Sequence, residues 1–255
     1  MNDLTALLMV FTGFAGFCTA ASAVYVFNDI LDRTQDATHP VKCLRPVAGG
    51  AVGVSGALIF FMVLSLLTGL LCLLVFQLDY FLIVLLYMTL NILYSFKLQH
   101  LAGLNAACVA AGFVLRVFAG AVIIDVPVSC WLAGLTFLLA MFLTVAKRRC
   151  EMACQGADGN KRLLFYPGAF LLAMIVLAGY LAYTLSPPVI REHNAPDLYL
   201  TSVWVALGLL RYLTVGFNRA GDCSPVTFFI KDRPLQICVA LWILTLWWVI
   251  YIHGN

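Results

Sequence analysis

Charged residues are scarce in this sequence, and their scarcity excludes an ordinary soluble domain. Only 11% of the 255 residues are Asp, Glu, Lys or Arg, and 63% are hydrophobic, whereas soluble domains carry about 25% charged residues. The apolar runs are continuous and do not alternate with polar residues, which excludes membrane-spanning strands as well. The chain is therefore predicted to be an integral membrane protein.

Motifs for thiol, zinc and histidine chemistry are also lacking. The nine cysteines form no CxxC pair, and most lie in apolar runs, where they behave as small hydrophobic residues. Cys150 and Cys154 have no His or Asp at zinc-ligand spacing, so we expect neither a zinc site nor a disulfide framework. The sequence has four histidines, His39, His100, His193 and His253. We expect all four to lie outside the membrane core.

Long hydrophobic segments, by contrast, fill most of the chain. Each is close to the 20 or so residues that a helix needs to cross a bilayer. Eight are predicted, over residues 4–27, 54–76, 79–96, 100–124, 128–146, 164–186, 197–217 and 234–252. They predict an all-α, polytopic helical bundle, and we expect one membrane-embedded domain over residues 1–255.

The basic residues are distributed unequally between the two sides of the predicted bundle. Twelve of the fifteen Lys and Arg residues fall in loops on the side that contains residues 28–50; the other three are Arg116, Arg191 and Arg211. The positive-inside rule places that side in the cytoplasm. We expect a multi-pass protein of the inner (plasma) membrane, with no nucleic-acid partner; an oligomer is compatible with the sequence.

One polar stretch, residues 25–50, interrupts the apolar pattern. On a helix, Asn28, Asp29, Asp32 and Asp36 fall on one face about 100° wide. A charged group at membrane depth costs about 2.5–3.5 kcal/mol even on a lenient scale, so a cluster of carboxylates requires a purpose. Binding of a divalent cation is the simplest one.

Arg116 lies deep in the segment 100–124 and shares a stripe about 90° wide with Asn105, Gly112 and Gly120. Two interpretations are open. The glycines can serve helix packing while Arg116 pairs with a carboxylate, or the arginine can face a polar cavity and bind phosphate.

The remaining polar features lie near the predicted membrane surface, and each has a structural alternative. Tyr94 and Lys97 are either interfacial anchors or ligands. Lys147 and Arg148 are either a topology signal or phosphate ligands, and Glu151 is spaced to pair with Lys147. Asp232, just before Pro234, is either a helix cap or a ligand, and Arg211 lies within the seventh segment.

The spacing Asn28-Asp29-x-x-Asp32-x-x-x-Asp36 resembles the NDxxDxxxD motif of the UbiA superfamily of intramembrane prenyltransferases. The continuation HPVKCLRPVAGG resembles the decaprenyl-phosphate phosphoribosyltransferase branch, also called decaprenylphosphoryl-5-phosphoribose synthases. Three further blocks are similar to that branch, at residues 94–121, 147–166 and 208–236.

The resemblance implies a Mg²⁺-dependent transfer of a 5-phosphoribosyl group from phosphoribosyl diphosphate to a polyprenyl phosphate, with release of diphosphate. It implies that Asp29, Asp32 and Asp36 are the catalytic magnesium ligands. It also implies phosphate-binding roles, which we extend to the other polar candidates: Asn28, Lys42, Arg45, Tyr94, Lys97, Arg116, Lys147, Arg148 and Arg211.

Two departures from the family pattern affect this expectation. The second acidic motif, DxxxD, is replaced by Asn105 and Val109, which disfavours the alternative of a prenyltransferase that uses a prenyl diphosphate. A non-enzymatic lipid carrier is a further alternative, but it leaves the carboxylate cluster unexplained. The family also implies nine spans, so we expect that the first is missing here.

Overall fold

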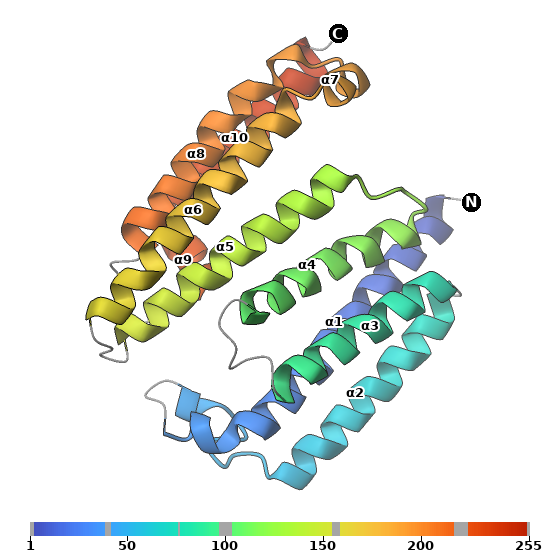
Figure 1. Ribbon diagram of the computed structural model, residues 1–255. Helices are drawn as coiled ribbons and strands as arrows, with labels where there is room; N and C mark the ends of the chain where they lie inside the picture. Colours follow the sequence, from blue (N-terminus) through green and yellow to red (C-terminus); the bar gives the residue numbers. More distant parts are fainter. Residues whose placement is uncertain are drawn as a thin grey trace. The chain divides into compact units, whose positions relative to one another are not determined.

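The computed structural model describes residues 3–38, 42–75, 77–96, 104–154, 159–216 and 224–253. All regular elements in these ranges are helical, as the sequence predicts. They are α1 (Asp3–Asp36), η1 (Lys42–Leu44), α2 (Val54–Val75), α3 (Leu78–Phe96), α4 (Leu104–Ile123), α5 (Cys130–Cys154), α6 (Gly159–Thr184), α7 (Pro187–His193), η3 (Pro196–Thr201), α8 (Ser202–Arg211), η4 (Tyr212–Gly216), α9 (Pro225–Lys231), α10 (Arg233–Trp248) and η5 (Val249–His253) (Figure 1).

Seven helices in the described ranges are long and apolar enough to cross a membrane. The remaining segment expected from the sequence, 197–217, is the seventh in chain order, and its described part is helical but changes type twice. It consists of the 3-10 helix η3, the short α-helix α8 and the π-helical turn η4. Apolar composition predicted the segment but could not predict these changes of helical type. The protein is a multi-pass membrane protein.

The chain forms two compact units, Met1–Ala133 and Gly134–Asn255. In the first unit α1 packs along α2 and also contacts α3 and α4. Its core contains Ala20, Val24, Val75 and Tyr80, each at most 2% exposed. Helix α1 has 34 residues and is therefore about 50 Å long, more than the roughly 30 Å hydrocarbon core. Its polar C-terminal turns can therefore extend beyond the hydrocarbon.

The second unit has its own core around Tyr212. The ring of Tyr212 makes edge contacts with Phe142 and Phe228, and Ala169 fills the same cluster. Polar side chains in this unit pair across helices: the indole of Trp242 donates to the Tyr180 hydroxyl over 2.8 Å. Such pairing is expected where no water can satisfy polar groups.

One expectation about the cysteines is wrong. Cys150, near the end of α5, takes part in a disulfide bond. Spacing in sequence did not indicate this bond because disulfide formation requires spatial proximity, which a cysteine pattern alone does not give.

Candidate active site

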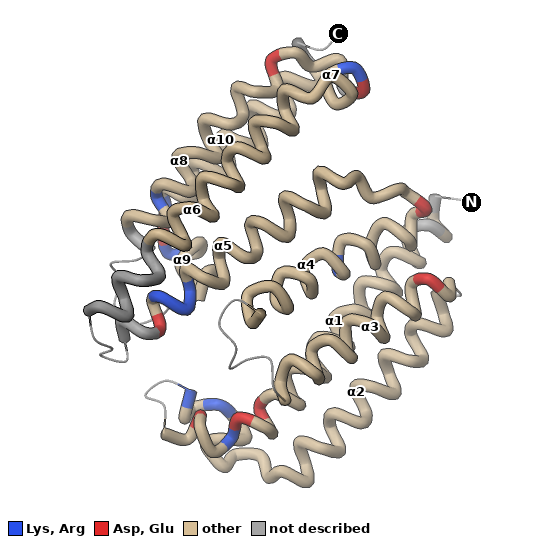
Figure 2. Tube along the Cα trace, viewed as in Figure 1, with Lys and Arg blue, Asp and Glu red and all other residues tan. Residues whose placement is uncertain are grey.

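The aspartate motif lies on the last turns of α1, which continues as one helix to Asp36. Asp29, Asp32 and Asp36 are separated by three and four residues, so their side chains project from the same face. Asp36, the final helical residue, is only 3% exposed. Figure 2 shows that charged residues of the first unit gather where α1 ends and the next loop begins. The helical face predicted from the sequence is therefore present.

Arg45 returns from the following loop to this face. Its Nη1 donates to Asp29 Oδ1 over 3.0 Å and to Asp36 Oδ2 over 2.8 Å. Two carboxylates that are two helical turns apart thus converge on one cationic nitrogen. The sequence predicted Arg45 as a phosphate ligand; the structure gives it a position between two of the predicted metal ligands.

Backbone hydrogen bonds fold the loop tightly around Arg45. The Arg45 amide donates to the carbonyl of Lys42, and the Gly49 amide donates to the carbonyl of Arg45 over 2.7 Å. A Cβ at Gly49 would lie 3.0 Å from the Cys43 carbonyl oxygen and 3.2 Å from that of Arg45. Glycine is therefore favoured there because it permits this close approach, which fixes the backbone that carries Arg45.

Asn28 is held from a neighbouring helix. The Ser95 hydroxyl on α3 is hydrogen-bonded to the side-chain amide of Asn28 and also lies 2.7 Å from the carbonyl of Asn91. Ser95 is 5% exposed, so this contact is shielded from water. Sequence reasoning missed Ser95, although it lies beside Tyr94 in a block that we had singled out.

Arg116 lies among aromatic rings. Its guanidinium donates to the Tyr87 hydroxyl over 3.0 Å and lies over the rings of Phe17, Tyr87 and Phe113 at 5.0–5.9 Å. It also interacts with Tyr25, one turn before Asn28. No carboxylate in the described residues is paired with it. Cation–π contacts can hold such a charge at low dielectric.

The two glycines beside Arg116 have different surroundings. A Cβ at Gly112 would make ordinary contact with Tyr87 and Asn91 of α3, at 3.6 and 3.9 Å, whereas a Cβ at Gly120 would meet nothing within 4 Å. Gly112 therefore serves the packing of α4 against α3. The ion pair between Arg116 and a carboxylate, which was one of the two interpretations of the sequence, is not present among the described residues.

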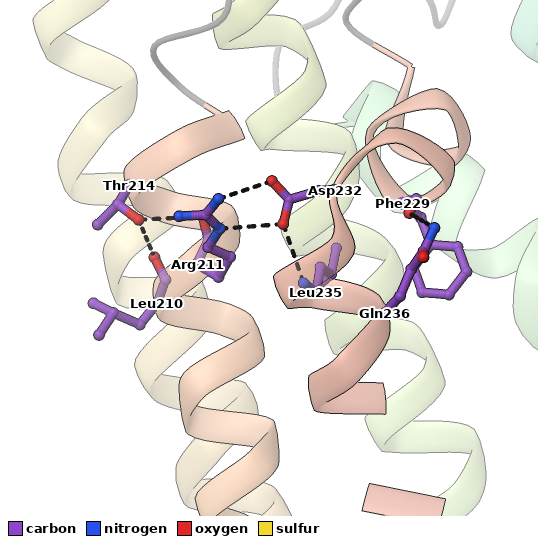
Figure 3. A network of polar contacts seen from close by, with 7 residues as sticks. All are labelled: Leu210, Arg211, Thr214, Phe229, Asp232, Leu235 and Gln236. Atoms are coloured by element: carbon purple, nitrogen blue, oxygen red, sulfur yellow. Dashed lines mark hydrogen bonds and ion pairs between the residues drawn. The ribbon is translucent and has the colours of Figure 1, made fainter. Parts of the chain in front are cut away.

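The predicted residues of the second unit have partners within that unit. Lys147 Nζ lies 3.8 Å from Glu151 Oε1, which confirms the pairing expected from their spacing. Arg211 forms a bidentate pair with Asp232 (Figure 3). Asp232 also caps α10 by accepting a hydrogen bond from the Leu235 amide, which confirms the cap interpretation.

The remaining candidates have less defined surroundings. Tyr94 lies on α3, Lys42 in η1 and Arg148 on α5, all partly exposed. Lys97 lies outside the described residues. The phosphate-binding roles of all these residues stay predictions.

The carboxylates of α1 suit a hard cation by their chemistry. Magnesium prefers oxygen ligands and commonly binds through one or two carboxylates together with substrate phosphates. In the described residues no group of three or more His, Cys, Asp and Glu side chains is arranged as a metal site. Asp29 and Asp36 nevertheless meet at one positive charge, the Arg45 guanidinium. The donor set therefore fits Mg²⁺: the two carboxylates would be ligands, and oxygen atoms of the substrate would complete the coordination.

A helical membrane bundle with an aspartate cluster at the end of its first helix is typical of a class of intramembrane transferases. Residues 2–163 match the model of the UbiA prenyltransferase family, and the chain belongs to this family. Decaprenyl-phosphate phosphoribosyltransferase of Mycolicibacterium smegmatis is 30% identical over 95% of this chain and 80% of that protein. The protein of the same name from Corynebacterium glutamicum is 27% identical over 96% of this chain and 77% of its own length.

Solved structures support the fold. A UbiA homolog from Archaeoglobus fulgidus, bound to GPP and Mg²⁺, superposes with a TM-score of 0.71 over 96% of this chain and 88% of that chain. The two sequences are 18% identical, so this similarity establishes the helical architecture alone. The protein is thus a membrane transferase of the UbiA family.

Proposed function

We propose that this protein transfers a 5-phosphoribosyl group from phosphoribosyl diphosphate to a polyprenyl phosphate, with Mg²⁺, at the cytoplasmic face of the plasma membrane. The observation that carries the proposal is the convergence of Asp29 and Asp36 on a single cationic position. Its substrate assignment is supported by the relatives from M. smegmatis and C. glutamicum, which match almost the whole chain.

In the proposed reaction the bond between the ribose anomeric carbon and the diphosphate oxygen breaks. A bond from the anomeric carbon to an oxygen of the polyprenyl phosphate forms, and diphosphate leaves. When bound, Mg²⁺ would neutralise the charge on the diphosphate and orient it. The accepting phosphate is already ionised at pH 7, so the reaction requires no strong general base, which agrees with the expectation from the sequence that no histidine lies in the membrane core.

In the first unit, we assign some residues to metal binding and others to phosphate binding. Asp29, Asp32 and Asp36 would hold the metal, and Asn28, fixed by Ser95, would support it. Arg116 would bind a substrate phosphate, because three aromatic rings and the Tyr87 hydroxyl preorganise its charge, and it has no carboxylate partner among the described residues. Lys42, Tyr94, Lys97, Lys147, Arg148 and Arg211 remain further candidates for phosphate binding.

A direct assay tests the proposal. The purified protein in lipid is incubated with phosphoribosyl diphosphate, a panel of polyprenyl phosphates and Mg²⁺, and both diphosphate and the lipid product are measured. We expect diphosphate release only when both substrates and the metal are present, and a lipid heavier by one phosphoribosyl group. Chelation of Mg²⁺ should abolish both signals. Absence of product with every lipid of the panel would contradict the proposal.

The same assay separates this proposal from prenyl transfer. Helix α4 contains no Asp or Glu, so the second acidic cluster of the conventional family pattern is lacking there. We therefore expect no diphosphate release from geranyl diphosphate with an aromatic acceptor. Turnover of that donor, without turnover of phosphoribosyl diphosphate, would favour the conventional prenyltransferase activity instead.

A further inference from the structure

Arg45 places its own positive charge between two of the carboxylates proposed to hold the metal. One nitrogen, Nη1, contacts Asp29 Oδ1 and Asp36 Oδ2. The Asp36 side chain is 4% exposed, so its charge has little water around it. Asp36 therefore requires a positive partner at all times, and when no metal is bound another cation must supply that charge.

The same contact cannot persist unchanged when a divalent cation binds these oxygens. A guanidinium and a metal ion at the same two carboxylates would repel each other over a few ångströms. The Arg45 side chain can leave these carboxylates, because it is 39% exposed and hydrogen bonds between backbone atoms hold its loop. Rotation of the side chain would vacate the position without refolding the loop.

We propose that Arg45 is an exchangeable counter-cation, which neutralises Asp29 and Asp36 before the metal binds and turns to the diphosphate when the metal replaces it. The inference rests on the proposed function for the identity of the anion, but the exchange itself involves only the metal and a diphosphate. It assigns Arg45 two successive anionic partners, first the carboxylates and then the phosphate.

Coupled binding follows from this exchange. A metal ion alone must displace Arg45, which then loses its charged partners. A metal ion that arrives with diphosphate supplies Arg45 with a new anion, so the displaced arginine keeps a charge-assisted hydrogen bond. Metal and diphosphate should therefore each strengthen binding of the other, and by thermodynamic linkage the two factors should be equal.

The test measures Mn²⁺ binding to the full chain by electron paramagnetic resonance, with and without inorganic diphosphate. In the Arg45→Gln variant we expect Mn²⁺ alone to bind about tenfold more tightly than in the unmodified protein, since no charged hydrogen bonds must be broken. The strengthening of Mn²⁺ binding by diphosphate should shrink in the same variant. Unchanged or weaker binding of Mn²⁺ alone would overturn the proposal.

Arg33→Gln is the matched control. Arg33 lies on the last turns of α1, and its guanidinium donates to the Ile30 carbonyl. The substitution therefore removes one nearby positive charge but leaves the contacts of Asp29 and Asp36 with Arg45 in place. We expect Mn²⁺ binding to change much less in this variant. An equal change in both variants would mean that general electrostatics, and not occupation of the site by Arg45, controls the metal, and would also overturn the proposal.

Thermal unfolding covers the case in which Arg45→Gln folds poorly. The proposal expects Mn²⁺ to stabilise this variant more than the unmodified protein, because the metal replaces the missing charge. Should the variant fail to fold even with Mn²⁺, Arg45→Lys decides. Lysine lacks the planar guanidinium, so we expect tighter Mn²⁺ binding than with Arg45; equal or weaker binding would contradict the exchange.

The outcome is separable from that of the proposed function. Neither Mn²⁺ nor inorganic diphosphate reports on the transferred group. Exchange at Arg45 without phosphoribosyl transfer would leave the inference standing and overturn the substrate assignment, whereas transfer without exchange would do the reverse.

Discussion

Arg211 donates two hydrogen bonds to the carboxylate of Asp232, one from Nε and one from Nη2, each 3.1 Å long (Figure 3). Asp232 is 1% exposed and also accepts from the Leu235 amide at the start of α10. The pair thus joins the end of α8 to the junction between α9 and α10. A buried carboxylate of this kind needs its partner, so Arg211 has a structural task in addition to the phosphate role predicted from the sequence.

Removal of either member of this pair should destabilise the second unit. We expect Arg211→Gln and Asp232→Asn to lower the Tm by several degrees, because each leaves a buried polar group with an incomplete set of partners. Asp232→Ala should cost more, since loss of the helix cap alone is worth about 0.5–2 kcal/mol. Thermal unfolding in detergent measures these effects.

The exposed neighbour Arg233 supplies the control, and Arg233→Gln should leave the Tm nearly unchanged. If the two side chains interact directly, the double variant Arg211→Gln/Asp232→Asn should be more stable than the sum of the two single changes predicts. Strict additivity would argue against a direct interaction.

Neutralising the aspartates of α1 should abolish transfer. We expect Asp29→Asn and Asp36→Asn each to lower kcat/KM by at least about a hundredfold, because the metal contributes several kcal/mol to transition-state stabilisation. Asp125→Asn is the control: this residue lies outside the motif and has φ 53°, a conformation that asparagine tolerates. Retention of activity in both motif variants would leave the cluster without a catalytic role.

Tyr87 and Tyr80 give a comparison within one helix. Tyr87→Phe removes the hydroxyl that holds Arg116, and we expect it to raise KM for the phosphate-bearing substrate roughly three- to tenfold. The Tyr80 hydroxyl donates to the Gly13 carbonyl over 2.5 Å. Tyr80→Phe should therefore cost about 1 kcal/mol of stability and leave KM unchanged. Equal effects of the two changes on KM would contradict a substrate role for Arg116.

Loss of the Ser95 hydroxyl should affect the metal site through Asn28. We expect Ser95→Ala to weaken Mn²⁺ binding and to lower activity about tenfold, the usual scale for a group that orients a ligand. Ser65 offers the matched change, since its hydroxyl bonds the carbonyl of Phe61 in its own helix. Ser65→Ala should leave Mn²⁺ binding unaltered; if both variants bind Mn²⁺ normally, Ser95 does not position Asn28.

The sequence by itself determined the features that depend on composition and local spacing. Apolar runs determined the membrane helices, because every backbone polar group within lipid must be satisfied inside its own segment. Helical periodicity placed Asp29, Asp32 and Asp36 on one face and Lys147 beside Glu151. Local chemistry likewise made Asp232 a helix cap.

Only the tertiary structure decided which distant residues complete each site. Arg45 is separated from Asp29 by 16 residues, Arg211 from Asp232 by 21 and Ser95 from Asn28 by 67. Periodicity relates residues within one helix, but it does not show which face of a second helix or loop will meet them. The sequence therefore determined that the polar side chains of the motif share one helical face. The packing of α3 determined that Ser95 contacts Asn28, and the loop after α1 determined that Arg45 contacts Asp29 and Asp36.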